Sequence, residues 1–343
     1  MAASSRRLSY CLLKSNYTAL LRQVTFQKSR CVRSLSSAIT TETGKDDKDP
    51  FVVFRSQEVQ RILKKITGLN VEKVSHMVSS TLKKPTYKLL TEEETQEAEE
   101  SARKAAEWKL QMPPFMLPRK PIHDILSKDP DLEGFDSSKY VFTDISFGVS
   151  NKERLIVVRD TDGTLRKADW DERDRVNQVY NPTTGQVYIA PKMFDDENLE
   201  RVLNDDKYIY MLDRACVQFE PDNPDFIRVT HKTFEHINKN RKFDVLRSTR
   251  HFGPMTFYLT WNNKIDLLLV DMIHRGLMDD CIDVVNLYVI LHPTSKTANN
   301  MQDKQDIERV KTYCQNDAEN KAELELSIQA FEDSLRGKSK QTA

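Results

Sequence analysis

The spacing of apolar residues divides the chain into two helical stretches with a short strand-rich region between them. From residue 195 onward, apolar residues recur at intervals of three and four, the period of a helix buried along one side. This period predicts helices over 195–203, 207–219, 226–237, 243–261, 265–275 and 278–291, and a charged helical pair over 303–315 and 317–335. Gly276 stands between two of these helices as a left-handed stop. The predicted fold class is therefore mainly α, with irregular helical hairpins that resemble helical repeats but show no repeat consensus.

Strand signals dominate only the middle of the chain. Residues 139–149 and 154–158 are rich in β-branched and aromatic residues, and 165–168 would form a third, shorter strand. Asp162 and Gly163 lie between the last two strands and predict a two-residue type I′ turn, because both central positions of that turn need a positive φ. The region therefore predicts a small antiparallel β meander.

A helix is predicted directly after the meander. Asp169 and Glu172 have the spacing of a capping box, in which two side chains satisfy free backbone N–H groups at the start of a helix. The helix should start at Trp170 and carry Val176 and Val179 toward the core.

Two N-terminal helices are predicted from their caps. Ser56 can cap a helix that has one apolar stripe and ends at Gly68. Thr91 and Glu94 form a second capping box, and Pro113 must end the helix that follows. The apolar stripe of this second helix is thin, so the helix either needs a partner surface or is held by ion pairs between successive turns.

The remaining N-terminal pattern is extended or short. The proline-rich segment 112–118 is predicted to lie across another surface, and 121–126 is predicted as a short helix that leads into the meander.

Together these patterns divide the chain into six parts. They are a presequence at 1–41, a linker at 42–55, an extended N-terminal helical arm at 56–137, the β meander with its helix at 138–190, a helical-hairpin domain at 191–302, and a C-terminal helical pair with a tail at 303–343.

Charge changes the picture at the N-terminus. Residues 1–41 contain seven Lys or Arg, no acidic residue, many hydroxyl side chains and apolar residues that can share a helical face. This combination is typical of a mitochondrial presequence, with a disordered basic tail as the alternative. Without those seven, the 52 basic residues become 45 against 52 acidic ones, a net charge of −7. Such a chain does not wrap nucleic acid with its whole surface, so any RNA contact must be local.

Composition argues against several other classes of protein. No apolar run approaches the roughly 18 to 20 residues that a membrane helix needs. The 9 glycines form neither a Walker loop nor G-x-G-x-x-G, and no cysteines or histidines have the spacing of zinc ligands. We therefore expect no membrane span, cofactor, metal or small-molecule substrate, and buried thiols at Cys216, Cys281 and Cys314.

One motif points to catalysis. Residues 155–165, LIVVRDTDGTL, resemble the strand-DxDGT signature of haloacid-dehalogenase-type phosphatases. In that family the residue matching Asp160 would form an aspartyl-phosphate, Asp162 would be the general acid and base, and both would hold Mg²⁺. The chemistry also needs further residues at the ends of parallel strands, and no alternation of strand and helix follows Thr164 to supply them. A hairpin turn that spells the motif is preferred, and a Mg²⁺-dependent phosphatase is an alternative.

A local basic cluster is the candidate RNA-binding site. Its residues are Lys239, Arg241, Lys242, Arg247 and Arg250. Phe243, His251 and Phe252 lie among them, and cations beside aromatic rings suit a phosphate backbone with an occasional stacked base. A solvated loop and helix start is the alternative. A free-standing helical-repeat protein that used this cluster would bind single-stranded RNA with a strong dependence on salt.

Several segments, in order along the chain, resemble one known family. They are PTYKLLTEEETQEAEESARKAAEWKLQMPP, KYVFTDIS, RLIVVRDTDGTLRKADWDERDRVNQVY, QFEPD, HKTFEHI and FDVLRSTRHFG. The chain looks like the mitochondrial small-subunit ribosomal proteins numbered twenty-two, an animal mitoribosome-specific family, from about residue 57 to about residue 335. The resemblance implies a mitochondrial matrix location and a non-catalytic structural role in the small subunit. It also implies contacts with the small-subunit rRNA and neighbouring ribosomal proteins, and turn positions for Asp160 and Asp162.

Overall fold

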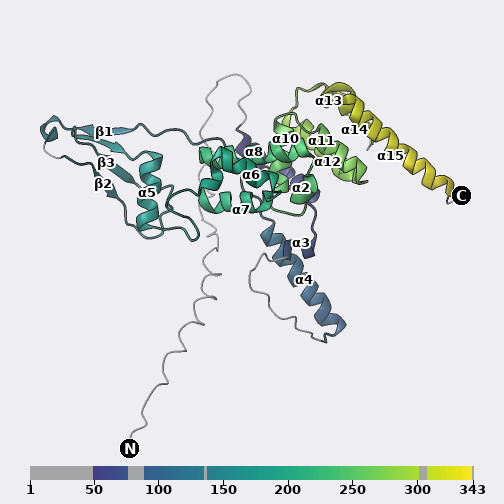
Figure 1. The fold of residues 1–343 in the computed structure, drawn as a ribbon, viewed down its shortest axis with the longest axis horizontal. Coiled ribbons are helices and arrows are strands. Elements are labelled where there is room, and N and C mark those ends of the chain that lie inside the picture. The colour runs from purple at the N-terminus through teal and green to yellow at the C-terminus, as the bar shows by residue number, and fades with distance from the viewer. Residues whose placement is uncertain (1–48, 76–88, 135–136, 301–306, 342–343) are drawn as a thin grey trace, which may run out of the picture. The chain divides into compact units, whose positions relative to one another are not determined.

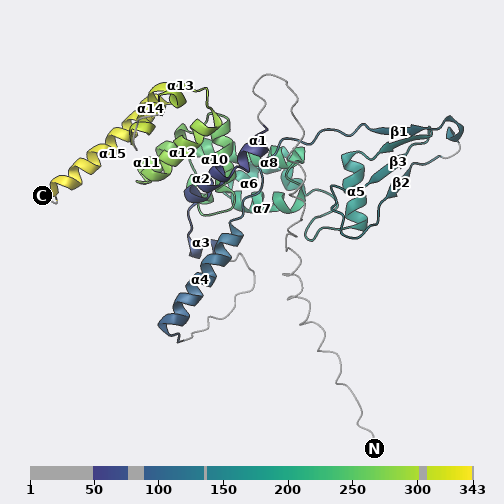
Figure 2. The same cartoon turned by 180° about the vertical axis from the view of Figure 1, so that it is seen from behind.

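The computed structural model describes residues 49–75, 89–134, 137–300 and 307–341, drawn in Figure 1 and from behind in Figure 2. The predicted presequence at 1–41 and the first half of the predicted linker at 42–55 lie outside these ranges. The predicted fold class is confirmed, because helices dominate and the described strands form one small antiparallel sheet. None of the described helices is both long enough and apolar enough to span a membrane.

The elements follow one another in this order. The N-terminal helices are α1 (Pro50–Phe54), α2 (Gln57–Thr67), α3 (Val71–Ser75) and α4 (Glu92–Lys109). The sheet module, as we call β1–β4 with α5, consists of β1 (Ile125–Lys128), β2 (Tyr140–Thr143), β3 (Ile156–Arg159), β4 (Thr164–Lys167) and α5 (Trp170–Tyr180), with a 3-10 turn at Pro130–Leu132. A second 3-10 turn at Lys192–Phe194 leads to α6 (Asp196–Asn204), α7 (Tyr208–Gln218), α8 (Pro224–Asn240), α9 (Phe243–Leu246), α10 (Phe252–Trp261), α11 (Asp266–His274), α12 (Met278–Leu291), α13 (Lys296–Asn299), α14 (Ile307–Asn316) and α15 (Lys321–Gln341).

Helix α2 has the caps that the sequence predicts. The Ser56 hydroxyl accepts from the Val59 N–H at 3.4 Å, and Gly68 ends the helix with a φ of +69°. Val59 and Leu63 are fully buried beside Phe257 of α10. The short helix α1, within the predicted linker, adds Phe54, whose ring meets Phe257 edge-on at 5.0 Å. The N-terminal helices α1 and α2 are thus part of the core of the C-terminal half.

Helix α4 has its predicted capping box, but its side chains are mostly exposed. The Thr91 hydroxyl accepts from the Glu94 N–H at 3.3 Å, and the Glu94 carboxylate accepts from the Thr91 N–H at 3.0 Å. Ala106 is its only buried residue, and Trp108 is 58% exposed. The thin apolar stripe of α4 therefore buries little apolar surface, as the sequence predicts.

The proline-rich segment lies across the helical bundle, by which we mean α2 with α6–α15. The ring of Phe115 lies 5.1 Å from that of Phe257. Met112 passes so close to Gly253 of α10 that a Cβ there would come within 2.1 Å of the Met112 sulfur. This confirms the prediction that the segment packs on another surface.

The sheet has the strand order β1-β4-β3-β2, and every pairing in it is antiparallel. The prediction of a short helix over 121–126 is wrong, because Ile125 pairs with Arg166 of β4 and Ser127 with Leu165. A segment of this length cannot nucleate a stable helix alone, whereas the edge of β4 offers it backbone partners. The predicted strand over 139–149 is also shorter, since pairing is confined to Tyr140–Thr143.

The turn between β3 and β4 has three residues instead of the predicted two. The Asp160 N–H donates to the Thr164 carbonyl at 2.9 Å, and the Gly163 N–H donates to the Asp160 carbonyl at 3.1 Å. Gly163 has a φ of +78°, whereas Asp162 has a negative φ, which is the geometry of a type I turn followed by a left-handed residue. Glycine is needed there for space as well, since a Cβ would meet the Asp129 carbonyl oxygen at 2.0 Å.

Helix α5 starts at Trp170 as predicted, and Val176 packs inward against Ile156 and Val158, as was also predicted. Val179 is 63% exposed, so its predicted inward position is wrong. The buried residues are Arg173 and Asn177, and the Arg173 guanidinium donates to the carbonyls of Lys152 at 3.0 Å and Arg154 at 2.8 Å. On this side, the helix therefore packs on a loop whose backbone carbonyls would otherwise lack hydrogen-bond donors, and Arg173 supplies them.

The predicted helix over 243–261 is two helices, α9 and α10. Ser248 lies between them with a φ of +59°, and its N–H donates to the Thr67 carbonyl at the end of α2, at 2.9 Å. A continuous helix would have used that N–H internally. The interruption instead ties α2 to the bundle.

The predicted helical hairpin of α11 and α12 is confirmed. Gly276 joins the helices with a φ of +76°, and Leu268 and Val285 are fully buried. Buried Asp266, at the start of α11, accepts from the Tyr313 hydroxyl at 2.7 Å and from the Asn320 N–H at 2.8 Å. This carboxylate fastens the C-terminal helices α14 and α15 to the hairpin.

Candidate nucleic-acid interface

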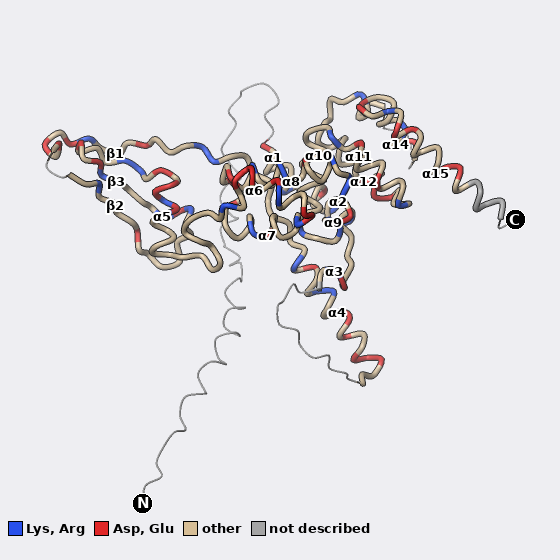
Figure 3. Tube along the Cα trace, viewed as in Figure 1, with Lys and Arg blue, Asp and Glu red and all other residues tan. Residues whose placement is uncertain are grey.

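The predicted RNA-binding residues all come from the connection between α8 and α10. Lys239 is in the last turn of α8, and Arg241 ends that helix in a left-handed conformation with a φ of +55°. Lys242 precedes α9, Arg247 ends it, and Arg250 precedes α10. Basic and acidic residues are interspersed along these helices, as Figure 3 shows, so each cation must be considered with its neighbours.

Four of the five cations are paired with carboxylates of other elements. Arg241 pairs with Glu323 of α15. The other three pairs are Lys242 with Asp206 at 2.5 Å, Arg247 with Asp280 of α12 at 2.9 Å, and Arg250 with Asp213 of α7 at 2.6 Å. Among the described residues, Lys239 has no such partner. The cluster therefore joins helices to one another and leaves one cation of the five unpaired.

The titration of the acidic partners supports this structural role. A hydrogen bond from Lys242 holds the pKa of Asp206 below its usual value. Burial raises the pKa of Asp280, although the Arg247 guanidinium opposes the rise. Phosphate groups would have to compete with Asp206 for Lys242, and with Asp280 for an Arg247 side chain that is 16% exposed.

Asp213 also holds the buried histidine of the cluster. His251 Nε2 lies 2.9 Å from Asp213 Oδ1. Burial lowers the pKa of His251 even though Asp213 raises it, so the ring is neutral at pH 7. Because the carboxylate can only accept, the neutral ring donates through Nε2. His251 is thus a satisfied core residue of α10.

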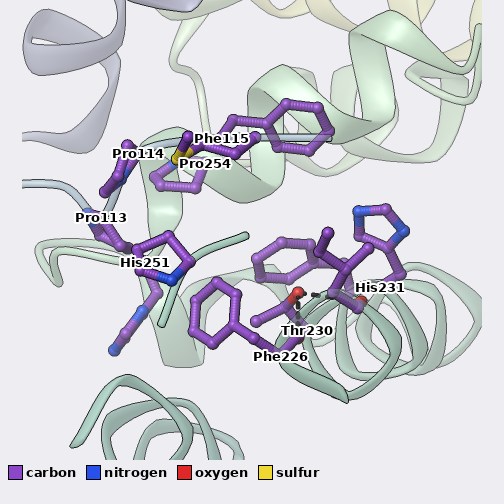
Figure 4. A pocket seen from close by; sticks show the side chains of 12 residues that line it. Pro113, Pro114, Phe115, Phe226, Thr230, His231, His251 and Pro254 are labelled. Carbon is purple, nitrogen blue, oxygen red and sulfur yellow. Dashed lines mark hydrogen bonds between the residues drawn. The ribbon is translucent and has the colours of Figure 1, made fainter. Parts of the chain in front are cut away.

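An apolar seam lies beside this histidine, as Figure 4 shows. Pro113, Pro114 and Phe115 of the extended segment face Phe226 and His231 of α8. The free volume is about 20 Å³, which is room for about one water molecule. The Phe115 and His231 rings stack with centroids 5.8 Å apart. The seam is packing between the strap-like segment and the bundle, not a substrate pocket.

The phosphatase alternative fails on geometry. Asp160 follows β3 in an antiparallel hairpin, and its carboxylate pairs with Arg166 at 2.8 Å and Lys139 at 3.0 Å. Asp162 accepts from both the N–H and the hydroxyl of Thr164, each at 3.0 Å. Across the ranges that the structure describes, no parallel strands pair and no three His, Cys, Asp or Glu side chains gather as metal ligands. Both aspartates are turn residues.

The three cysteine thiols of the described residues are wholly or partly buried. Cys281 and Cys314 are buried, and Cys216 is partly covered. Burial raises the pKa of Cys216 to about 11 and raises those of the other two thiols as well. Since the thiolate is the reactive form, none of the three is prepared for nucleophilic chemistry.

Comparison with known proteins gives a consistent result. The family described as mitochondrial 28S ribosomal protein S22 matches residues 52–293. The chain is similar to the small ribosomal subunit protein mS22 of Mus musculus, with 43% identity over 311 residues that cover 90% of this chain and 86% of the mouse protein. It is equally similar to the protein of the same name from Bos taurus, with 43% identity over 284 residues that cover 82% and 79% of the two chains.

Proposed function

Because the chain belongs to the family of mitochondrial 28S ribosomal protein S22, we propose that it is a non-catalytic, structural constituent of the mitochondrial small ribosomal subunit. The observation that carries this proposal is the 43% identity to two proteins named as small ribosomal subunit proteins, which extends over 90% of the chain in the mouse comparison. The protein works in mitochondria by holding rRNA and neighbouring ribosomal proteins together.

The chemistry of the chain supports a structural role. The Asp160–Asp162 pair is occupied by turn hydrogen bonds and ion pairs, and the apolar seam is filled by Phe115 and its neighbours. Helix α4 and one face of the sheet module expose apolar residues that a solitary protein would bury. Surfaces of this kind belong to a subunit that neighbours cover.

Sedimentation of a mitochondrial lysate at moderate salt and Mg²⁺ tests this function. The chain should migrate with the small subunit and the monosome, and RNase should release it from both. A chain that stays in the light fractions would overturn the proposal. If it bound single-stranded RNA there with a steep salt dependence, a free RNA-binding protein would replace it.

The rRNA contact at the basic cluster is a finer proposal. Lys239 supplies its strongest phosphate contact because it has no carboxylate partner among the described residues. Arg241 and Lys242 are about half exposed and can share their outer donors with phosphate, whereas Arg247 and Arg250 mainly hold helices together. The proposed rRNA contact thus involves Lys239, Arg241 and Lys242, and not all five residues of the cluster.

Charge reversal with ultraviolet crosslinking to RNA tests that contact. Lys239→Glu in the full chain should reduce the crosslinked RNA. Lys296→Glu makes the same change of charge at an exposed helix start outside the cluster and should leave the crosslink unchanged. Equal crosslinking in both variants, with the chain still in the subunit, would remove the cluster from the rRNA contact but keep the structural role.

A further inference from the structure

The two faces of the sheet differ in what covers them. Ile156 and Val158 of β3 are fully buried and pack with Val176 of α5, so α5 covers their face, as Figure 1 shows. Side chains alternate along a strand, and directly paired residues point to the same side. The register pairs Tyr140 with Arg159 and Phe142 with Val157, which places these four on the other face.

We call this other face the open sheet face. Its residues are Tyr140, Phe142, Val157, Arg159, Leu165 and Lys167. Phe142 is 51% exposed and Tyr140 is 46% exposed. An antiparallel sheet with one solvated face normally carries polar residues there, whereas four of these six residues are aromatic or aliphatic. An exposed patch of this composition is typical of a protein interaction surface.

Arg159 stands in the middle of this face without an acceptor. No carboxylate among the described residues pairs with it, and its terminal guanidinium nitrogens are not among the buried atoms of the described residues. Its neighbours differ, since Lys167 pairs with Asp124 at 2.6 Å and Lys139 with Asp160 at 3.0 Å. An accessible guanidinium that becomes covered needs an acceptor, and it pairs best with an anionic oxygen. Whatever covers the face therefore brings an anionic group to Arg159.

The surroundings of Arg159 favour a protein carboxylate over a phosphate. The rings of Tyr140 and Phe142 lie on the same face, but four of its six residues are apolar, whereas nucleic-acid interfaces are more polar and more basic than protein–protein interfaces. Asp144 directly follows the end of β2, and hydrogen bonds from Ser146 lower its pKa, so it is ionised at neutral pH. A negative charge beside the apolar patch repels an RNA backbone.

We propose that the open sheet face docks an apolar segment of a neighbouring protein of the small subunit, with one Asp or Glu of that segment paired to Arg159. This inference rests on the proposed function, because it takes its partner from the same particle. The apolar side chains of the segment cover Phe142 and Val157, and the carboxylate satisfies the guanidinium. The sheet module is then a protein-docking device, and the rRNA contact lies elsewhere on the chain.

A photo-crosslinking residue placed at Phe142 in the full chain tests the proposal within gradient-purified small subunits. The expected adduct is a protein whose crosslinked peptide carries an Asp or Glu within about one helical turn, or four residues, of the crosslinked position. The same probe at Val179, exposed on α5, is the matched control and should not give this adduct. An adduct that RNase removes would overturn the proposal, because RNA would then cover the face.

Charge variants separate docking from folding. Arg159→Glu should lower the yield of the adduct about tenfold, the effect of losing about 1.4 kcal/mol of binding. Arg175→Glu, on the exposed side of α5, should not change it. If Arg159→Glu also disturbed the module, reversing the charge of the identified partner carboxylate should restore the adduct. Failure of that reversal, with both chains in the subunit, would overturn the pairing.

Two failures are distinguishable. Small subunits that contain the chain but give no protein adduct from Phe142 would overturn the docking surface and leave the structural role intact. A chain that is absent from small-subunit fractions would overturn both.

Discussion

Two arginines of the helical bundle are paired with carboxylates of other helices, whereas Arg159 of the sheet module has no carboxylate partner among the described residues. Arg247 and Arg250 each pair across helices, and the bundle buries a continuous apolar core. The core of the sheet module is Ile156, Val158 and Ala168 with Val176 against them, while Phe142 and Tyr140 remain exposed. The described bundle thus covers its apolar residues within one chain, whereas the module leaves an apolar face for the neighbour that we propose.

The largest expected effect is on the core of the bundle. Leu268 is fully buried in the α11–α12 hairpin, so Leu268→Ala should lower the free energy of unfolding by about 3 kcal/mol through lost burial and a cavity. Guanidinium unfolding of the full chain, followed by circular dichroism, measures it. A loss below about 1 kcal/mol would mean that the bundle is packed too loosely to stand alone.

Loss of one ion-pair partner should cost less. Arg247→Ala leaves the largely buried carboxylate of Asp280 unpaired and should destabilise the chain by about 2 kcal/mol. Burial already raises the pKa of Asp280, so protonation should reduce this cost as the pH falls toward 5.

A matched control uses an exposed pair. Lys264→Ala removes a cation that pairs with Glu235 at 3.1 Å in solvent, and its effect should be about 0.5 kcal/mol. Equal costs for the two variants would mean that burial does not govern the pairs of the bundle.

A change of pH should separate the two regions. Burial lowers the pKa values of His231 and His251 in the bundle, so the folded state binds fewer protons than the unfolded chain near pH 6.5. Stability from these residues is therefore complete above that pH and falls as the pH drops through it. Glu172 of the module also has a lowered pKa, chiefly through Arg166, and its contribution is lost only below about pH 4.

Single-tryptophan variants can report this difference. Trp261 stacks on Phe257 in the bundle, and Trp170 donates to the Lys120 carbonyl in the module. Between pH 7.5 and 5.5, the urea midpoint seen by Trp261 should fall, and the midpoint seen by Trp170 should hold. Parallel shifts would show that the two regions unfold as one unit.

The smallest effect on stability is expected on the open sheet face. Phe142→Ser should change the free energy of unfolding by less than about 0.5 kcal/mol, because the ring is half exposed in the isolated chain. Phe54→Ser, at a buried ring against Phe257, is the contrasting control. The Phe142 variant should also self-associate less in analytical ultracentrifugation. A large loss of stability would show that the chain itself covers this face.

The sequence patterns correctly predicted the features that depend on contacts between residues close together in the chain. Ser56, the Thr91–Glu94 box and Gly276 set helix ends through contacts within a few residues, so their spacing was sufficient to predict them. The strand at 125–128 and the break at Ser248 depend on β4 and on Thr67, far along the chain, and nothing local encodes either pairing. Arg173 points inward in place of Val179 because it donates to loop carbonyls such as that of Arg154. Only the folded module brings that loop near α5, so the sequence pattern could not predict it.

In the candidate site, too, local features could be predicted and long-range pairings could not. The sequence identified the five cations between α8 and α10, but their acidic partners lie from 33 to 82 residues away. Local spacing could not distinguish a cation that faces solvent from one that fastens a helix. The open sheet face was missed because a strand can be predicted without its register, and only the register assigns Phe142 and Arg159 to one side.

The packing of α2 and of Met112 also sets an order of events. Both lie against α10, whose residues follow them by more than a hundred positions, and α2 further contacts α12. A chain that emerges from its N-terminus must therefore keep the apolar stripe of α2 uncovered until Leu291 has arrived. Closing so long a loop is slow compared with forming a local helix. The newly made protein thus passes through an interval in which the apolar stripe of α2 is exposed to solvent, before α10 and α12 cover it.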